Sequence, residues 1–334
     1  MPSRFFHHWV RLLSCLTLLF THPAVAQTLA YITNQGDNSV SVIDTGIGSV
    51  VATIKVGEKP AGVMASHDGT RVYISNPESQ SISVIDTGKQ AVIKTISSGE
   101  GPLAMEISAD DKHLYVADWY RNSVSVFDTR NFSLLKEIRV GDSPSGIAVD
   151  PDGRRLYISN RDDNNVMVVD LQTGEILKVI ATGKAPFGLL LNRSAHHLYT
   201  ANVQSGDVTV IDVSTYQVIT TVKVKLFPYA FAYDSARQHL FVTNQHDNSV
   251  SVIDAGNYQV IKTIDVGDYP EGIAIHPSGD AIYVANWFDG EVSVIDTGTL
   301  EVVDSITTGE GSRAYGNFIS TRRTLQPASP KAAD

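Results

Sequence analysis

The chain has 334 residues, with 36 acidic and 26 basic side chains and a formal net charge of −10 at pH 7. A negatively charged protein repels nucleic-acid phosphates and anionic lipid, so we expect no nucleic-acid partner and favour cationic or neutral ones. After the N-terminal region, no stretch approaches the roughly 18 apolar residues of a membrane span, so we expect no membrane-spanning segment there.

The first 26 residues differ from everything that follows. Arg4 and Arg11 frame a basic start, an apolar run comes next, and Ala-Val-Ala at residues 24–26 fits a small-residue cleavage site. This pattern predicts a secretory signal peptide over residues 1–26, and therefore a periplasmic or secreted protein. The only cysteine, Cys15, lies in this segment. We therefore expect the mature chain to have no disulfide, thiolate metal ligand or cysteine nucleophile.

One pattern recurs seven times at a spacing of 42 residues. An aromatic residue marks each copy and is followed three positions later by Asn or Asp: Tyr31 and Asn34, Tyr73 and Asn76, Tyr115 and Asp118, Tyr157 and Asn160, Tyr199 and Asn202, Phe241 and Asn244, Tyr283 and Asn286. An aspartate closing an apolar run keeps the same register: Asp44, Asp86, Asp128, Asp170, Asp212, Asp254 and Asp296. A fixed period of this length is typical of a repeat architecture.

Each copy predicts four short strands. In one copy, β-branched and apolar runs at residues 146–149, 155–159, 166–169 and 175–180 alternate with turns rich in Gly, Pro, Asn and Asp. This alternation is typical of an antiparallel meander. A four-stranded meander cannot bury both faces alone, so copies must stack, and radial stacking gives one β-propeller blade per copy. The sequence therefore predicts an all-β, seven-bladed propeller over residues 27–319.

The two ends of the repeat region are expected to meet. The chain starts at the second strand of a copy, residues 29–33, and ends with an isolated first strand, residues 312–319. We expect that C-terminal strand to complete the blade formed by the first three strands of the chain and so close the ring, because closure removes open sheet edges. Residues 320–334 have no repeat pattern and are expected to form a mobile tail.

The copies resemble YVTN-type repeats, named for a tetrapeptide that appears here as Tyr-Ile-Thr-Asn at residues 31–34, Tyr-Ile-Ser-Asn at 73–76 and Phe-Val-Thr-Asn at 241–244. The resemblance covers residues 28–319 and implies a bacterial or archaeal exported seven-bladed propeller. That family mixes binding proteins, surface-layer proteins and members without an assigned activity. The resemblance therefore implies a fold and no specific chemistry.

Positions that recur in all copies are interpreted as scaffold, because a role needed in each blade is a blade-building role. Small residues two positions after each recurring proline fit inner strands that crowd the axis: Gly62, Ala104, Gly146, Gly188, Ala230 and Gly272. The Asn and Asp landmarks are expected to hydrogen-bond the nearby backbone in Asx-type turns.

Ligand contacts are expected on the loops, which differ between copies. The loops entering the first strands and those joining second to third strands share one face of the disc. The entering loops carry a mostly acidic ring: Glu58, Glu100, Asp142, Lys184, Leu226, Asp268 and Glu310. The binding candidates on this face are Trp119, Tyr120, Arg121, Tyr229, His246, Tyr269, Trp287, Phe288 and Arg313. Aromatic rings beside carboxylates favour a cationic or amphipathic guest, although solvated acids and structural tryptophans would give the same pattern.

Glu106 is the remaining candidate. Counting alternation from Pro102 places Ala104 and Glu106 toward the axis, and Leu103 and Met105 toward neighbouring blades. The matching residues of the other copies are small or apolar: Met64, Ala148, Leu190, Ala232, Ala274 and Gly316. A carboxylate there could hold a cation, or could lie in a water-filled channel without a role.

These observations predict a monomeric, non-catalytic binding or scaffold propeller that recognises a protein, a peptide or a small cationic or amphipathic ligand on one face, without a cofactor. Two alternatives stay open. One is a lyase or hydrolase at the channel mouth, with Glu106 and His246 as acid and base groups. The other is a periplasmic accessory protein for a metal or redox cofactor. The sequence has no nucleophile elbow, phosphate loop or dinucleotide motif, and no histidine pair with metal-ligand spacing.

Overall fold

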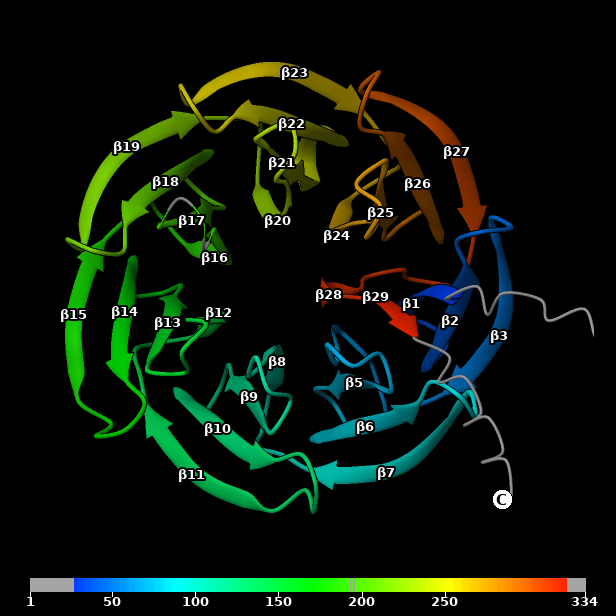
Figure 1. Cartoon of the computed structure of the whole chain (residues 1–334), viewed down its shortest axis with the longest axis horizontal. Coiled ribbons are helices and arrows are strands. Elements are labelled where there is room, and N and C mark those ends of the chain that lie inside the picture. The colour runs from blue at the N-terminus through cyan, green and yellow to red at the C-terminus, as the bar shows by residue number, and fades with distance from the viewer. Residues whose placement is uncertain (1–26, 193, 195, 323–334) are drawn as a thin grey trace, which may run out of the picture.

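The computed structural model describes residues 27–192, 194 and 196–322. Seven sheets are arranged radially around a central channel, and each sheet is one blade (Figure 1). This arrangement confirms the predicted all-β, seven-bladed propeller. The predicted signal peptide, residues 1–26, lies outside the described residues, as do residues 323–334 of the predicted tail.

Each blade has one strand beside the channel and its other strands in order outward from it. From the channel outward, blade 1 contains β29 (Ile319–Arg322), β1 (Gln27–Asn34), β2 (Ser39–Asp44) and β3 (Ser49–Lys55), and blade 2 contains β4 (Gly62–Ala65), β5 (Arg71–Asn76), β6 (Ser81–Asp86) and β7 (Ala91–Ser97), with β28 (Tyr315–Asn317) beside β4. Blade 3 contains β8 (Pro102–Ile107), β9 (His113–Asp118), β10 (Ser123–Asp128) and β11 (Leu134–Arg139), and blade 4 contains β12 (Pro144–Val149), β13 (Arg155–Asn160), β14 (Asn165–Asp170) and β15 (Ile176–Ala181). Blade 5 contains β16 (Pro186–Asn192), β17 (His197–Asn202), β18 (Asp207–Asp212) and β19 (Gln217–Lys223), and blade 6 contains β20 (Pro228–Asp234), β21 (His239–Asn244), β22 (Ser249–Asp254) and β23 (Gln259–Asp265). Blade 7 contains β24 (Pro270–Ile275), β25 (Ala281–Asn286), β26 (Glu291–Asp296) and β27 (Glu301–Thr307).

The described part of the chain has a single helical element, the short 3-10 helix η1 (Gln245–Asp247). No helix in that part is long and apolar enough to cross a membrane. The landmark aromatic side chains lie on the second strands, and Tyr31, Tyr73, Tyr157, Tyr199 and Phe241 are almost completely buried. The second strands are buried on both faces, whereas the outermost strands expose most of their residues. The core is therefore a set of layers between blades.

The recurring polar landmarks have two structural roles. The aspartates accept hydrogen bonds from the backbone two or three residues later, as Asp170 does from Thr173 N at 2.9 Å. These are the predicted Asx-type turns. The asparagines instead act mainly across the sheet: Nδ2 of the buried Asn244 donates to Ser249 Oγ at 3.1 Å and to Ser251 Oγ at 3.0 Å. The turn prediction is thus right for the aspartates, while the asparagines clamp neighbouring strands.

The ring closes through the C-terminal strand, as predicted. β29 pairs antiparallel with β1, and the two strands lie together at the junction of the red and blue ends of the chain in Figure 1. The pairing segment comes later than the expected residues 312–319 and includes residues 320–322, which the sequence pattern assigned to the tail. Ser312 still forms a bridge to Asn34 of β1. The residues that follow it, in β28, pair in parallel with β4 of blade 2 instead, so regular pairing with β1 starts only at β29.

Where the repeat position two residues after the recurring proline holds glycine, the inner strands of neighbouring blades approach too closely for a side chain to fit between them. A Cβ on Gly146 would overlap the carbonyl oxygen of Phe187, and a Cβ on Gly188 would overlap that of Tyr229. This contact explains why the repeats keep a small residue at this position.

Truncation tests the closure. Ending the chain at Gly311 removes β28 and β29 and exposes the edge of β1, so we expect the melting temperature to fall by about 10 °C or more. A chain that ends at Arg322 keeps every pairing residue and is the control. Differential scanning calorimetry would compare these two chains with the full-length protein. Equal melting temperatures for all three would show that ring closure contributes nothing to thermal stability.

The turn aspartates predict a loss of stability in acid. Backbone N–H donation, chiefly from the residue three positions later, lowers the pKa of Asp170, Asp212 and Asp296 below the ordinary value. The Arg130 guanidinium lowers the pKa of Asp128 to about 2. A carboxyl whose pKa is lower in the folded state stabilises the fold above its unfolded pKa, and this contribution is lost as the pH falls through the folded value.

The free energy of unfolding should therefore stay level from about pH 7 to 5 and then fall between about pH 4 and 2. Urea denaturation at each pH would measure it. A triple variant with Asp170→Asn, Asp212→Asn and Asp296→Asn keeps the side-chain acceptors but not the titrating groups. Its profile should fall less steeply, and an unchanged slope would contradict the assignment.

Candidate functional site

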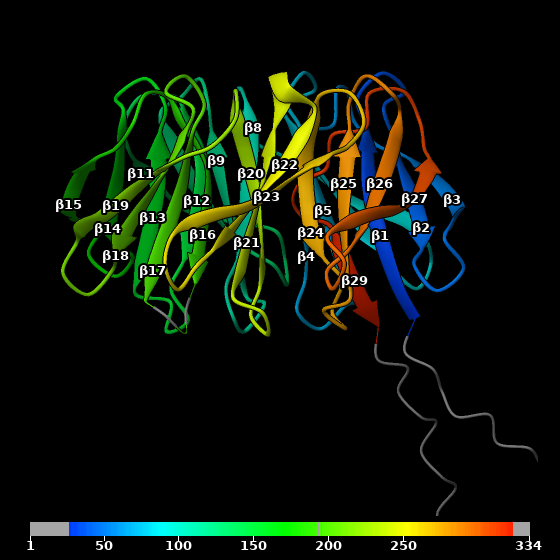
Figure 2. The same ribbon diagram turned by 90° about the horizontal axis from the view of Figure 1, so that it is seen from above.

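The disc has two unlike faces (Figure 2). The upper face carries the loops that enter the inner strands and those that join second to third strands, including η1. The lower face carries the ends of the described chain, at the start of β1 and the end of β29. The acidic ring of the entering loops lies on the upper face, and all seven of its residues are exposed.

A ring of side chains surrounds the channel below the upper face. Its members occupy one repeat position, 42 residues apart, and we call them the channel ring: Ala61, Leu103, Ser145, Phe187, Tyr229, Glu271 and Arg313. The backbone of the channel ring is held in place by hydroxyl groups on the second strands, each of which donates a hydrogen bond to the carbonyl oxygen of a ring residue in the next blade. The four bonds are Thr33 to Ala61 at 3.2 Å, Ser75 to Leu103 at 2.9 Å, Ser159 to Phe187 at 2.8 Å and Thr243 to Glu271 at 3.0 Å. The scaffold therefore fixes the ring, while its side chains differ from blade to blade.

One side of the channel ring is a buried polar network. Nε of Arg313 donates to Glu271 Oε2 at 2.5 Å, and its Nη2 donates to the Tyr229 hydroxyl at 3.0 Å. Gln245 Nε2 donates to the other Glu271 oxygen at 3.0 Å. Burial raises the pKa of Glu271, and the Arg313 guanidinium opposes that rise. Glu271 and the Tyr229 hydroxyl together hold the Arg313 guanidinium in one orientation within the channel ring.

The other side of the channel ring is aromatic. Phe187 stacks on Tyr229 with ring centroids 4.3 Å apart, and Tyr315 meets both rings at 5.3 and 5.4 Å. Trp119, from the loop after β9, packs against Phe187 at 5.9 Å. The aromatic rings and the Arg313 network together form a layer across the channel.

Above this layer lies a pocket of about 400 Å³, which we call the upper pocket. Trp119, Tyr120, Leu103, Phe187 and Arg313 contribute to its wall. Its rim includes Gln35, Lys59, Pro77, Glu78 and Gly101. Tyr120 is 69% exposed although it is a large aromatic residue. The pocket thus combines aromatic surface, one partly exposed guanidinium and charges of both signs.

A second aromatic group lies on the same face over blades 6 and 7. His246 stacks on Phe227 with centroids 3.8 Å apart, and Tyr269 contacts His246 at 5.4 Å. Trp287 and Phe288 continue the group, at 5.5 and 5.2 Å from Tyr269. Phe288 is 67% exposed. These side chains extend the aromatic surface of the upper face away from the upper pocket.

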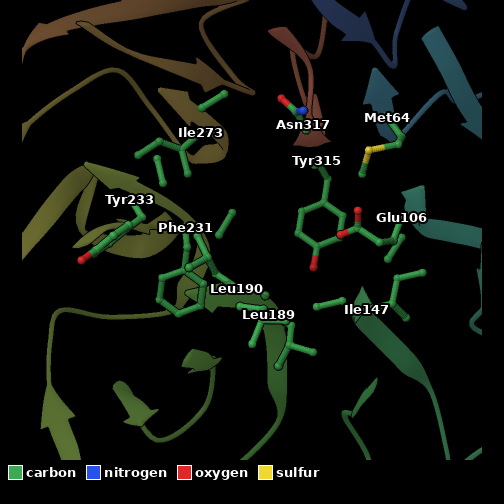
Figure 3. Close-up of a pocket in the computed structure, with 18 of the residues that line it drawn as sticks. Met64, Glu106, Ile147, Leu189, Leu190, Phe231, Tyr233, Ile273, Tyr315 and Asn317 are labelled. Atoms are coloured by element: carbon green, nitrogen blue, oxygen red, sulfur yellow. The ribbon is translucent and has the colours of Figure 1, made fainter. Parts of the chain in front are cut away.

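Below the layer lies a larger cavity of about 690 Å³, the lower cavity. Glu106 and Tyr315 point into it from the inner strands β8 and β28 (Figure 3). Ala104 and Glu106 line it, as the alternation predicted. Met105 also borders it, but packs in a buried cluster with Met64 and Tyr73 of the neighbouring blade, as predicted. The prediction is wrong for Leu103, which lines the upper pocket, because a bulge between Pro102 and Met105 interrupts the alternation there.

The ten candidate residues therefore separate into four groups. Trp119, Tyr120 and Arg313 come together at the upper pocket, with Tyr229 just beneath. The second aromatic group takes His246, Tyr269, Trp287 and Phe288. Glu106 lies in the lower cavity. Arg121 pairs with Glu137 on the outermost strand at 3.4 Å and does not line either cavity.

Two functional side chains were absent from the sequence prediction. Glu271 and Gln245 complete the Arg313 network. Glu271 could have been found, because it occupies the same repeat position as Arg313 and is the only acid there. Gln245 had no such signal, since the contact depends on the turn that η1 makes between β21 and β22 of blade 6. Among the described residues, no group of three or more His, Cys, Asp or Glu side chains could hold a metal ion.

The sequence matches the YNCE-like beta-propeller family over residues 25–319. The chain belongs to this family. The match spans all seven blades, in agreement with the resemblance to YVTN-type repeats. A search of the curated proteins found no match.

Several solved structures share the fold. Hydrazine synthase from Kuenenia stuttgartiensis is similar with a TM-score of 0.73 and 22% identity, covering 80% of this chain and 92% of that one. A functionally unknown protein from Desulfotomaculum acetoxidans DSM 771 has a TM-score of 0.77 and 14% identity, covering 88% and 98%. Dihydro-heme d1 dehydrogenase NirN in complex with DHE has a TM-score of 0.67 and 16% identity, covering 85% and 74%. At these identities the likeness concerns the fold alone.

The ion pair in the channel ring predicts a non-additive effect on stability. Arg313→Met should lower the free energy of unfolding by about 3–5 kcal/mol, because it leaves the Glu271 carboxylate buried without its cation. Combining Arg313→Met with Glu271→Gln removes both charges and should recover most of the loss. Chemical denaturation of the unaltered protein, the two single variants Arg313→Met and Glu271→Gln, and the double variant would complete the double-mutant cycle. Additive effects would contradict a coupled buried pair.

Proposed function

We propose that the protein is a non-catalytic binding propeller that holds a small amphipathic cation in the upper pocket. The observation that carries this proposal is the position of Trp119 and Tyr120, whose rings line a pocket on a face rimmed by acids. Large aromatic side chains that remain exposed beside a concave surface commonly mark a binding site.

The aromatic wall suits the apolar part of such a guest and also its charge. The Arg161 guanidinium already lies 5.7 Å from the Trp119 ring centroid, so this ring attracts a cation within the protein itself. Tyr120 offers a second, more exposed ring at the pocket's edge. A guest with an aromatic or aliphatic body would cover these rings and displace water from them.

The charges around the pocket support a positive guest. The seven-residue ring of the entering loops has five acids and one lysine, all exposed. Within the pocket, Glu78 opposes Lys59, and the Arg313 charge is compensated by Glu271. The Arg161 charge beside Trp119 is paired with Asp162. The acids of the entering loops therefore leave an excess of negative charge on this face, which favours cations and weakens as salt increases.

The geometry also supports binding over the hydrolase or lyase alternative. Glu106 lies in the lower cavity, whereas His246 lies on the upper face against Phe227. An acid and a base that act on one bond must reach the same substrate. These two side chains are on different sides of the aromatic layer.

Fluorescence can test the upper pocket directly. The chain has three tryptophans, and Trp9 lies in the predicted signal peptide, so Trp287→Phe leaves Trp119 as the reporter of the remaining chain. Benzyltrimethylammonium should change the emission of Trp119 saturably, and the affinity should fall at high salt and by at least about tenfold in Tyr120→Ala. Ile47→Ala removes an equally exposed apolar side chain elsewhere and is the matched control.

The outcomes separate the proposals. Benzyl alcohol binding as tightly as the ammonium would remove the role of charge, and no saturable response to either would overturn the upper pocket as the site.

A planar redox cofactor is the second candidate ligand, because the stacked aromatic layer lies directly below the pocket and one structural neighbour is a dihydro-heme d1 dehydrogenase. A shifted haem absorption band that Trp119→Ala abolishes would favour that candidate.

A further inference from the structure

The lower cavity is separate from the upper pocket. The two share no lining residue, and the boundary crosses single strands: Leu103 lines the upper pocket and Ala104 the lower cavity, and likewise Phe187 and Gly188. The layer of Phe187, Tyr229 and Tyr315 lies between them. A molecule in one cavity therefore does not contact the walls of the other.

The lower cavity opens toward the face that carries the chain ends. Its wall includes His67, Ser194 and Ser235, which lie in the turns between first and second strands. Its closed end is formed by Ala104, Ala230 and Tyr315, next to the aromatic layer. The cavity is thus a cup with its mouth on the lower face, opposite the acidic ring.

Small residues create the space in this cup. One repeat position supplies Ala148, Ala232, Ala274 and Gly316 to the wall, where a larger side chain would point into the cavity. The adjacent position supplies large apolar side chains, among them Ile147, Leu189, Phe231 and Ile273 (Figure 3). The cavity therefore has a predominantly hydrocarbon wall with volume to spare.

Several of these apolar side chains are incompletely buried although they lie at the centre of the protein. Leu189, Leu190, Leu191 and Phe231 all retain partial exposure. A hydrocarbon wall offers water few hydrogen bonds, so covering it with an apolar molecule is favourable. A volume of about 690 Å³ lies within the range of about 300–1,000 Å³ typical of small-molecule sites.

Polar side chains also lie on the wall, among them Glu106, Asn192, Tyr233 and Asn317, and would orient a guest. Glu106 and Asn317 project into the cavity from β8 and β28, which lie on either side of β4 (Figure 3). The carboxylate accepts hydrogen bonds and the amide both donates and accepts. Such a wall fits an apolar skeleton with one hydrogen-bond donor that stays uncharged near neutral pH, such as a hydroxyl or a diarylamine N–H.

We propose that the lower cavity is a second, independent binding site for a small uncharged molecule with an apolar skeleton and one hydrogen-bond donor. This site takes a different class of ligand from the upper pocket, because its mouth is on the other face and its wall is largely hydrocarbon. The proposal does not depend on occupancy of the upper pocket.

Methionine methyl groups can report binding without a mutation. Met64 and Met105 line the lower cavity, while Met167 is buried in β14 and does not line it. N-phenylnaphthylamine is a neutral apolar probe with one N–H donor, and it fluoresces strongly in apolar surroundings. Titrated into protein labelled with 13C at the methionine methyls, it should bind one to one and shift the Met64 and Met105 signals while leaving Met167 unchanged.

Variants then locate the site. Ala232→Leu should weaken probe binding at least tenfold by filling the cavity, and Trp119→Ala in the upper pocket should leave it unchanged. If Ala232→Leu does not fold, the methyl shifts in the unaltered protein still decide. Absence of saturable binding, shifts that include Met167 equally, or loss of binding in Trp119→Ala would each overturn the proposal. Failure here would leave the upper pocket untouched, because benzyltrimethylammonium binding is measured by Trp119 emission.

Discussion

The close approach of neighbouring inner strands is the constraint on which the rest of the structure depends. At Gly146 and Gly188, the backbone of one blade lies against a carbonyl oxygen of the next, with no room for a side chain. The matching position holds only glycine or alanine in the other copies, so the inner strands of seven blades meet around one axis and leave a channel. Closure through β29 then requires the last strand to reach β1 with the same spacing.

This constraint also creates the candidate sites. Because the inner strands are fixed by backbone contacts and by hydroxyl bonds such as that from Ser159 to the Phe187 carbonyl, their channel-facing side chains do not have to build the fold. They can differ between blades, and they do. Phe187 and Tyr229 stack on one side of the channel ring, while Arg313 and Glu271 pair on the other. The channel is thereby divided into two cavities with different surroundings.

The repeat pattern predicted much of this architecture and some of the site. The 42-residue period predicted the blades and the closing strand, and comparing copies at one position selected Glu106 and the aromatic residues of the upper face. It placed Leu103 wrongly, because strict alternation assumes a regular strand, whereas a bulge follows Pro102. It also passed over Glu271, although this residue is the only acid at its repeat position, and its contact with Arg313 is visible only in the structure.

The number of blades, their strands and the positions at which the inner strands must be small can all be read from the repeats. These properties depend on local turn chemistry and on a repeated contact, and both recur in the chain at a fixed spacing. Which unlike side chains share a cavity depends instead on how the blades are arranged in space. Trp119, Phe187 and Arg313 belong to three different copies, and their meeting depends on the curvature of the ring and on bulges in the inner strands. No local pattern carries that information, because each of these side chains obtains its neighbours from across the channel.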